Sequence, residues 1–519
     1  MKKYFQKGDI DGFFGLFIDN LLQLMVIYEL CIHVLQFPTD LVIQKILPGS
    51  ALSILLGNLF YSYQAKKLME KENRDDVTAL PYGINTPSVF AFIFFIMAPV
   101  LRKTEDPNLA CKAGLFACLL SGIMEVLGAF IGDFIRKKTP RAALLSPLAG
   151  IAITFICMGF VFRIFNNPVV ALIPMFLIII TYASRITLPL RLPGGLVAIV
   201  VGIAIAWISH AAGWGYFTPK QIATEISFTP PIWSMGDLFS LLQNQEFWGY
   251  MAIIFPMGLF NIIGSLQNLE SAEAAGDTFE TRPSLLVNGI GSVSAAFFGS
   301  PFPTTIYIGH PGWKNMGARA SYSAINGVVI ALFCFCGALS FLVHFIPLEA
   351  VLGIILWIGV IMMSQSFSDT PKKHYLAIAI GLIPCLAAWA YLLIVNSLEV
   401  AGTNLKEMQQ ALAIRDIHIG GVIALNQGFL VTSMIYAATA VYIIERKFKI
   451  AAIWILSAAV CSFFGIIHAY ELTETVNTVI GINAAPAYSV LYLILAVILL
   501  GFNYLPDRKE AESVPNTET

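Results

Sequence analysis

The first hydrophobic segment of the chain carries an acid and two amides that could handle protons or a polar ligand. Asp19 and Gln23 are four residues apart, so they share one face of a helix, and Asn20 lies beside them. A charged group in the middle of a membrane is costly and usually faces a cavity or a partner. Because burial favours the uncharged form of a carboxyl group, these three residues are candidates for proton coupling, with Asp19 as the carrier. The alternative is that Asp19 lies near water or Lys7 and only orients its helix.

A stripe of neutral polar residues marks a later apolar segment. Asn261, Ser265 and Asn268 recur at i, i+4 and i+7, which places them on one helical face. Their amides and hydroxyl offer both donors and acceptors to a ligand. The alternative is hydrogen bonding between helices, which Asn and Ser often provide in membrane bundles. Glu125, in an earlier apolar segment, is open to two interpretations, a proton relay or an acid that packs helices together.

Two apolar segments that should position these residues cannot be continuous helices. Ala79–Met97 has prolines at 81 and 87 with Gly83 between them, and Ser300–Gly312 has prolines at 301, 303 and 311. Proline removes a backbone donor and disfavours the helical conformation of the residue before it, so both segments should enter the membrane extended. Such backbone is tolerated in lipid only where it is buried in protein or lines a cavity. Interrupted segments at corresponding positions of two halves point to a transporter's binding site.

The extended segments should offer backbone donors and acceptors to a ligand, helped by the positive ends of the helices that follow. Side chains that could add contacts, or that could equally satisfy the local backbone, are Asn85, Thr86, Ser88, Thr304, Thr305 and Tyr307. His310 could donate to a ligand or titrate near neutrality, or it could only bond at the start of a helix.

The composition is that of a membrane protein with many spans. Of 519 residues, 57% are hydrophobic and only 12% are charged, with a mean hydropathy of +0.76, whereas a soluble domain has about 25% charged residues. The eight cysteines lie mostly in apolar segments without paired spacing, so neither disulfides nor a metal site is expected. We find no HExxH, P-loop or GxSxG motif. The sequence therefore predicts neither an enzyme nor a cofactor.

Hydrophobic segments long enough to span a membrane divide into two sets. Seven precede the polar connection Ala211–Glu246 and seven follow it, the last being Val422–Ile444, and two more form a carboxy-terminal hairpin. The densest basic clusters fall on one side, which places both termini in the cytoplasm. An odd number of spans in each half makes the halves inverted repeats. Weak similarity of residues 15–24 to 258–269, and of 48–60 to 288–300, supports the inversion.

Several motifs carry a resemblance to a known family. The PYG-type extended segment, TPRAALLSPLAGIA, LPGGLVAIVVG and FFGSPFPTTIYIGHPG resemble the xanthine/uracil permease family, also called the nucleobase/ascorbate or nucleobase–cation symporter-2 family. The similarity covers roughly Gly12–Ile444 and is nearer to the hypoxanthine/guanine permease branch. It implies an all-α protein with seven plus seven inverted spans and short antiparallel strands in spans 3 and 10. It also implies proton-driven uptake of a nucleobase at those strands.

The resemblance also implies how the spans divide into domains, and it makes a homodimer an expected state. The expected boundaries are a core domain over 1–136 and 247–345, a gate domain over 141–209 and 347–445, an extracellular connection over 210–246, an extra transmembrane hairpin over 450–503 and a disordered tail over 506–519. The expected location is the cytoplasmic (inner) membrane. No nucleic-acid partner is expected.

The chain departs from this family at its two acids. Asn261 stands where the family usually has an acid on span 8, and YIG replaces the family's YIE, so that Gly309 stands in the second place. Amides still match the donors and acceptors on the edge of a purine. The predicted substrate-binding residues are Asn85, Thr86, Ser88, Phe90, Asn261, Ser265, Asn268, Thr305, Tyr307, Gly309 and His310.

Two other functions stay open. The first is an anion transporter or exchanger on the same fold, which loss of both acids favours because an anion site needs helix amino termini without nearby carboxylates. Against it, Lys314 and Arg319 are the only basic residues near either extended segment, and we place both toward the cytoplasm. The second is a receptor or scaffold that transports nothing, for which the broken spans would have no purpose.

Overall fold

The structure is a computed structural model that describes residues 5–184, 186, 188–189, 194–218, 228–242, 245–307, 309–315, 317–338, 347–472 and 476–505. The predicted tail over 506–519 and parts of the connection over 210–246 lie outside these residues. The chain divides into two compact units, Met1–Lys138 with Ile151–Ile361, and Thr139–Gly150 with Met362–Thr519. Each unit is described by itself.

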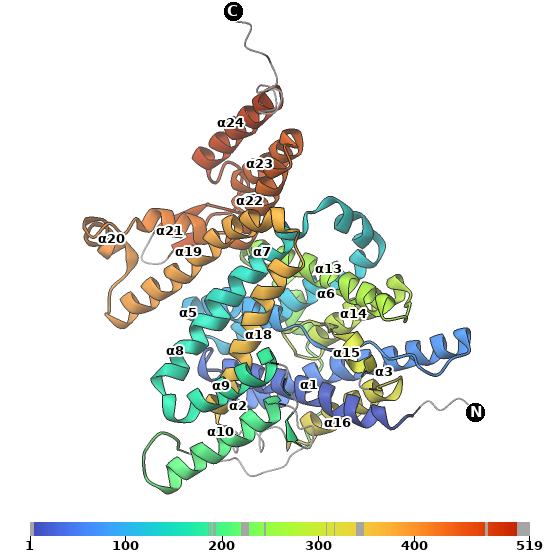
Figure 1. Cartoon of the computed structure of the whole chain (residues 1–519). Helices are drawn as coiled ribbons and strands as arrows, with labels where there is room; N and C mark the ends of the chain where they lie inside the picture. Colours follow the sequence, from blue (N-terminus) through green and yellow to red (C-terminus); the bar gives the residue numbers. More distant parts are fainter. Residues whose placement is uncertain are drawn as a thin grey trace, which may run out of the picture. The chain divides into compact units, whose positions relative to one another are not determined.

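The helices and strands follow one another in a fixed order (Figure 1). Up to the central connection they are α1 (Gly8–His33), α2 (Thr39–Leu41), η1 (Val42–Ile46), α3 (Leu47–Glu72), β1 (Tyr82–Ile84), α4 (Thr86–Phe92), η2 (Ile93–Met97), α5 (Ala98–Thr104), α6 (Pro107–Lys138), α7 (Arg141–Ile151), η3 (Ala152–Met158), α8 (Gly159–Asn166), α9 (Pro168–Ser184) and α10 (Gly194–Ala211).

After it come α11 (Met235–Leu242), α12 (Gln245–Trp248), α13 (Met251–Ala274), α14 (Thr281–Phe297), β2 (Thr304–Ile306), α15 (His310–Asn315), α16 (Ser321–Phe335), α18 (Leu348–Ser368), η5 (Lys372–His374), α19 (Tyr375–Val400), α20 (Leu405–Ile414), α21 (Ile419–Asn426), α22 (Phe429–Ile444), α23 (Phe448–Phe463), β3 (Tyr470–Leu472), β4 (Val476–Thr478) and α24 (Pro486–Phe502).

The larger unit is built around two extended segments. β1 and β2 come from distant parts of the chain and form a two-stranded antiparallel sheet. α16 packs against both α1 and α3, and α14 packs against α6 and α3 (Figure 1). The buried core around the strands includes Leu16, Tyr61, Tyr82, Ile306 and Tyr322, contributed by α1, α3, both strands and α16. The strands therefore lie inside a shell of helices, where their backbone groups must be satisfied by protein.

Apolar helices dominate the described residues. Nine of their helices are long and apolar enough to cross a membrane, or ten if one bent pair counts as a single span. Four more apolar helices in the same residues have 10–17 residues, among them α23 and α24 of the predicted carboxy-terminal hairpin. These two helices pack against each other, and the short β3–β4 hairpin lies between them in sequence. The β3–β4 pair was not predicted from the sequence.

The bent pair corrects one predicted span in the smaller unit. Val422–Ile444 is not one continuous helix, because α21 and α22 meet at 84°. Gly428 lies at the break with φ +67°, a left-handed conformation, and a Cβ there would collide with the backbone of Ile466. The backbone N–H of His468 donates to the Gln427 carbonyl at 3.2 Å. The break is therefore set by packing against the segment after α23, which the sequence of the span does not reveal.

Candidate functional site

The predicted strands in spans 3 and 10 are confirmed, and they pair with each other. Tyr82 faces Ile306, Gly83 faces Thr305 and Ile84 faces Thr304. The ladder continues at both ends, because the N–H of Tyr307 donates to Pro81 O at 2.7 Å and that of Asn85 donates to Pro303 O at 2.9 Å. Pro81 and Pro303 come directly before the two strands, and they contribute carbonyls to the ladder at positions where it needs no N–H. The paired strands bring the two halves of the chain together.

A helix begins directly after each strand. The helix after β1 runs over 19 residues, Thr86–Thr104, and the side chain of Asn85 caps it by accepting from Ser88 N at 2.8 Å. Within the described residues the Ser88 hydroxyl, which is fully buried, has no hydrogen-bond partner. After β2, α15 begins at His310. Gly309 precedes it with φ +111°, and a Cβ there would approach Trp313 to 2.9 Å, so this backbone requires glycine.

The predicted face of α1 lies against the strand pair. The Asn20 amide donates to Tyr82 O at 3.2 Å, and its oxygen accepts from the Tyr307 hydroxyl at 3.4 Å. Asp19 is within electrostatic range of the hydroxyls of Tyr307 and of Tyr182 on α9. In the part of the chain that the structure describes, neither the side chain of Asp19 nor that of Gln23 makes a hydrogen bond. The Asn20 amide therefore bonds to the strand segments, whereas the side chains of Asp19 and Gln23 have no hydrogen-bond partner among the described residues.

The polar stripe on α13 also faces the strands, and its side chains hydrogen-bond to other groups of the protein. Asn268 donates to Ile306 O at 2.7 Å, and the hydroxyls of Ser265 and Thr305 lie 3.2 Å apart. Asn288 on α14 donates to Ser265 at 2.7 Å. The structure thus brings Ser265, Asn268 and Thr305 together as predicted. Their hydrogen bonds are those of the alternative interpretation, in which Asn and Ser join helices.

Asn261, the first residue of the polar stripe, contacts Glu125 on α6. Asn261 donates to Glu125 at 3.0 Å and to the Ser121 hydroxyl at 3.3 Å. All three side chains are buried. Both Asn261 and Glu125 were candidates from the sequence, but the sequence did not predict that they would touch.

Phe90 is packed among other aromatic rings. It is fully buried, stacked on Phe94 at 6.4 Å between ring centroids and edge-on to Phe160 at 6.0 Å. Thr86 and Tyr307 are partly buried beside the strands.

Several residues that hold the strands in place were not predicted from the sequence. Ser53 and Asn58 on α3 bond to the Thr304 hydroxyl and to Tyr82 O at 2.6 and 3.1 Å. Ser292 on α14 bonds to both the N–H and the carbonyl of Thr304. A signal was present, because Asn288 and Ser292 are four residues apart in an apolar segment, as in the stripe on α13.

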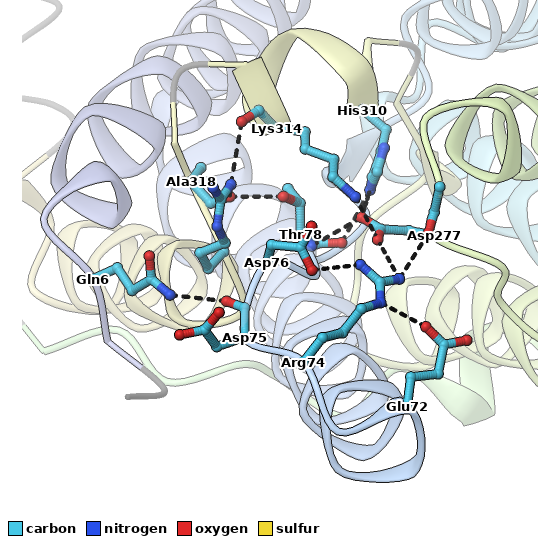
Figure 2. A network of polar contacts seen from close by, with 12 residues as sticks. Gln6, Glu72, Arg74, Asp75, Asp76, Thr78, Asp277, His310, Lys314 and Ala318 are labelled. Atoms are coloured by element: carbon cyan, nitrogen blue, oxygen red, sulfur yellow. Dashed lines mark hydrogen bonds and ion pairs between the residues drawn. The ribbon is translucent and has the colours of Figure 1, made fainter. Parts of the chain in front are cut away.

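His310 lies in a different environment from the other predicted residues. Its Nε2 is 3.0 Å from Thr78 O and 3.2 Å from the carboxylate of Asp277 (Figure 2). Both partners accept, so Nε2 carries the hydrogen. Among the described residues the buried Nδ1 has no partner. His310 thus connects α15 to the segments that follow α3 and α13.

Asp277 is the centre of that network (Figure 2). It accepts from Arg74 at 2.8 Å, from Lys314 at 2.6 Å and from the N–H of Thr78 at 3.0 Å. Burial alone would raise the pKa of Asp277, but hydrogen bonds from His310, Lys314, Thr78 and Arg74 outweigh it and lower the pKa to about 2. Lys314, placed near the strands by the sequence, is therefore already paired.

Comparisons with known proteins bear on the fold. No protein-family profile and no curated protein sequence matches this chain. Among solved structures, the transmembrane domain of a cyanobacterial bicarbonate transporter, BicA, is similar with a TM-score of 0.53 and 16% identity, over 73% of this chain and 94% of that one. The murine Solute Carrier 26 family member A9 anion transporter, in its inward-facing state, is similar with a TM-score of 0.50 and 12% identity, over 75% of this chain and 68% of that one.

The chain shares the fold of these two transport proteins. It is the seven-plus-seven inverted-repeat fold expected from the sequence, with short antiparallel strands in two broken spans. The resemblance to nucleobase permeases is supported at the level of this shared fold, and the two similar structures reported above are described as a bicarbonate transporter and an anion transporter.

Proposed function

We propose that this membrane protein is a secondary transporter of a small anion, which binds beside the β1–β2 strand pair. The observation that carries the proposal is that the side chains suited to a nucleobase are engaged by the protein itself. Asn261 bonds to Glu125, Asn268 to the carbonyl of Ile306, and Phe90 is enclosed by other rings. A base would have to displace buried hydrogen bonds, each of which is costly to leave unmade.

A small anion would need only donors, and the strand–helix junction has them. The 19-residue helix that begins at Thr86 directs the positive end of its dipole toward the end of β1. The unpartnered Ser88 hydroxyl lies in its first turn and is one further donor. In support, the two structural neighbours are themselves a bicarbonate transporter and an anion transporter.

Protonation of the Asp19 carboxyl group couples uptake of the anion to the proton gradient. An ionised Asp19 near the strands would repel an anion, because Coulomb interactions are strong where water is excluded. A proton on Asp19 removes that repulsion. The anion and a proton therefore travel together, and an inward proton gradient drives uptake.

A second candidate function is nucleobase transport, and one observation favours it. The uncommitted Gln23 amide and Asp19 carboxyl together present both donors and acceptors to the strand pair. That pattern fits a base edge better than a simple anion. Deciding between the two requires direct transport measurements.

The deciding experiment is uptake into proteoliposomes of labelled bicarbonate, chloride, sulfate, formate, xanthine, guanine and uracil, each with and without an inward proton gradient. We expect saturable uptake of at least one anion, faster with the gradient, and none of any base. Saturable uptake of a base alone would replace the proposal by the second candidate. Uptake of nothing would reject both.

Asp19→Asn should abolish the response to the proton gradient, because the amide cannot take up a proton. We expect gradient-driven uptake to fall by at least about tenfold, which is less than the roughly 10²–10⁴-fold that a positioned general acid or base contributes in enzymes. Asp11→Asn is the matched control, because Asp11 lies on the same helix but is exposed. Intact uptake with intact pH dependence in Asp19→Asn would refute the role of Asp19.

A further inference from the structure

Glu125 is a buried acid that the proposed anion site does not use. It lies on α6 with no exposed surface, and it accepts from the Asn261 amide at 3.0 Å and from the Ser292 hydroxyl at 3.4 Å. Asn261 also contacts the Ser121 hydroxyl. Two helices, α13 and α14, thus direct polar side chains at a carboxyl group on α6.

No positive charge neutralises this carboxyl group within the described residues. The titratable groups in its electrostatic range are Tyr61 on α3, Tyr82 on β1 and Cys118 on α6, and α13 and α14 present only Asn261 and Ser292. None of these is a cation. Hydrogen bonds from two neutral groups do not compensate the cost of a buried, unpaired carboxylate. One positive charge bound beside an ionised Glu125 would therefore neutralise the cluster.

Asn261 has an unused group beside the acid. Its side-chain oxygen is buried and has no hydrogen-bond partner in the described part of the chain. In the present orientation the Asn261 NH₂ group donates to an ionised Glu125. If the side-chain amide flips by 180°, its oxygen can accept from a protonated Glu125 instead. The same oxygen, with the carboxylate and the hydroxyls of Ser121 and Ser292, also makes an all-oxygen set of the kind that hard cations prefer.

We propose that Glu125, Asn261, Ser121 and Ser292 form a binding site for a monovalent cation, either a proton or Na⁺, behind the strand pair. The site is separate from the proposed anion site, and its existence does not depend on which substrate is carried. Its link to transport does rest on the proposed function.

Ser292 supplies that link. Its single hydroxyl hydrogen has three acceptors within reach, Glu125 at 3.4 Å, Asn288 O at 3.2 Å and Thr304 O at 3.2 Å. The N–H of Thr304 in turn donates to the Ser292 oxygen at 3.1 Å. A hydroxyl donates one hydrogen at a time, so a cation on Glu125 releases it toward β2. Occupancy of the cation site is thereby transmitted to the strand.

The test measures binding without transport. The melting temperature of the purified full-length chain in detergent is followed against Na⁺, with choline replacing it at constant ionic strength, and separately against pH. Ligands that bind only the folded state stabilise it in a saturable way. We expect a rise of a few degrees either with Na⁺ at fixed pH or with falling pH in its absence, and the arm that responds identifies the cation.

Glu125→Gln should lose the dependence that the wild type shows, because the amide resembles the neutral acid and holds neither cation. Glu29→Gln is the matched control, since Glu29 is another buried acid in a span but has His33 at 3.0 Å, and it should keep the wild-type dependence. A wild type that responds to neither cation, or a Glu125→Gln variant that responds as the wild type does, overturns the site.

Ser292→Ala separates the site from its coupling and serves if Glu125→Gln does not fold. This variant keeps the carboxyl group and removes the hydroxyl that reaches Thr304. We expect its melting temperature to keep a cation dependence that saturates at a higher cation concentration, because one oxygen ligand is lost, and we expect most gradient-driven accumulation in proteoliposomes to be lost even at cation concentrations that saturate the site. Accumulation equal to that of the wild type would overturn the link. If no substrate is accumulated by any variant, the melting data still decide the site.

Discussion

Gly83→Ala should abolish transport, with uptake reduced by about a hundredfold or more, as expected when a binding geometry is displaced by about an ångström. Gly83 is the central residue of β1 and faces Thr305. A Cβ at this position would collide with the side-chain oxygen of Asn20 and with the hydroxyl of Tyr307. Relief of that collision must displace either the Asn20 side chain, whose amide holds the carbonyl of Tyr82, or the Tyr307 ring, and both border the proposed anion site.

The measurement is initial uptake in proteoliposomes, paired with the melting temperature to confirm that the variant is folded. Gly264→Ala is the matched control, because a Cβ there has only the tip of Phe260 nearby, at 4.0 Å. Alanine also favours a helix over glycine by up to about 1 kcal/mol, so this control should be at least as stable as the wild type. Normal uptake by Gly83→Ala would contradict the close approach of α1 to the strands.

Asp277→Asn should produce the largest loss of stability. The fully buried carboxylate holds Arg74, Lys314, His310 and the backbone of Thr78 in one network (Figure 2). Breaking a buried ion pair costs roughly 3–5 kcal/mol. We expect the lower end of that range, because Arg74 keeps Glu72 and Asp76 as partners and the Lys314 side chain is 16% exposed.

The pH dependence of this contribution has a definite sign. The folded pKa of Asp277, about 2, lies below the ordinary value of 3.8, because its hydrogen bonds favour the charged form. Its contribution is therefore complete above the ordinary pKa and is lost as the pH falls through the folded value. The difference in melting temperature between wild type and Asp277→Asn should be constant from neutral pH down to about 5 and should shrink below about 4.

Asp75→Asn is the control for this network, because Asp75 is in the same loop but its side chain is exposed. It should change the free energy of unfolding by no more than about 0.5 kcal/mol. A loss in Asp277→Asn that is equally small would mean that the ion pairs do not hold the loops together.

The sequence predicted the parts of this fold that depend on local backbone chemistry. Pro81, Pro301 and Pro303 exclude helix where they lie, and Pro87 is compatible only with the first turn of a helix, so the strands could be placed to within a few residues before any coordinates were known. The break before α22 was missed because no proline marks it. A single glycine inside an apolar segment is usually tolerated, and only the contact of Gly428 with the backbone of Ile466 shows why the chain bends there.

Partners across the fold were beyond what periodicity can predict. The spacing of Asn261, Ser265 and Asn268 correctly placed them on one face, but their choice of Glu125, Thr305 and Ile306 depends on how α13 packs against α6 and β2. His310 was assigned to the substrate for its position after β2. Its partner Asp277 follows α13 in a loop, and no spacing rule connects the two.

The carbonyl of Tyr82 has a mechanical consequence. It accepts from Asn20 on α1 and from Asn58 on α3, and Ser323 on α16 bonds to Asn58 in turn. Peeling β1 away would break the bonds from Asn20 and Asn58 in a region without water to replace them. α1 and α3 are therefore tied to the strand pair, and α16 is tied to α3 through Asn58. If the proposed transporter moves its strands, the least costly motion carries these three helices with them as one block.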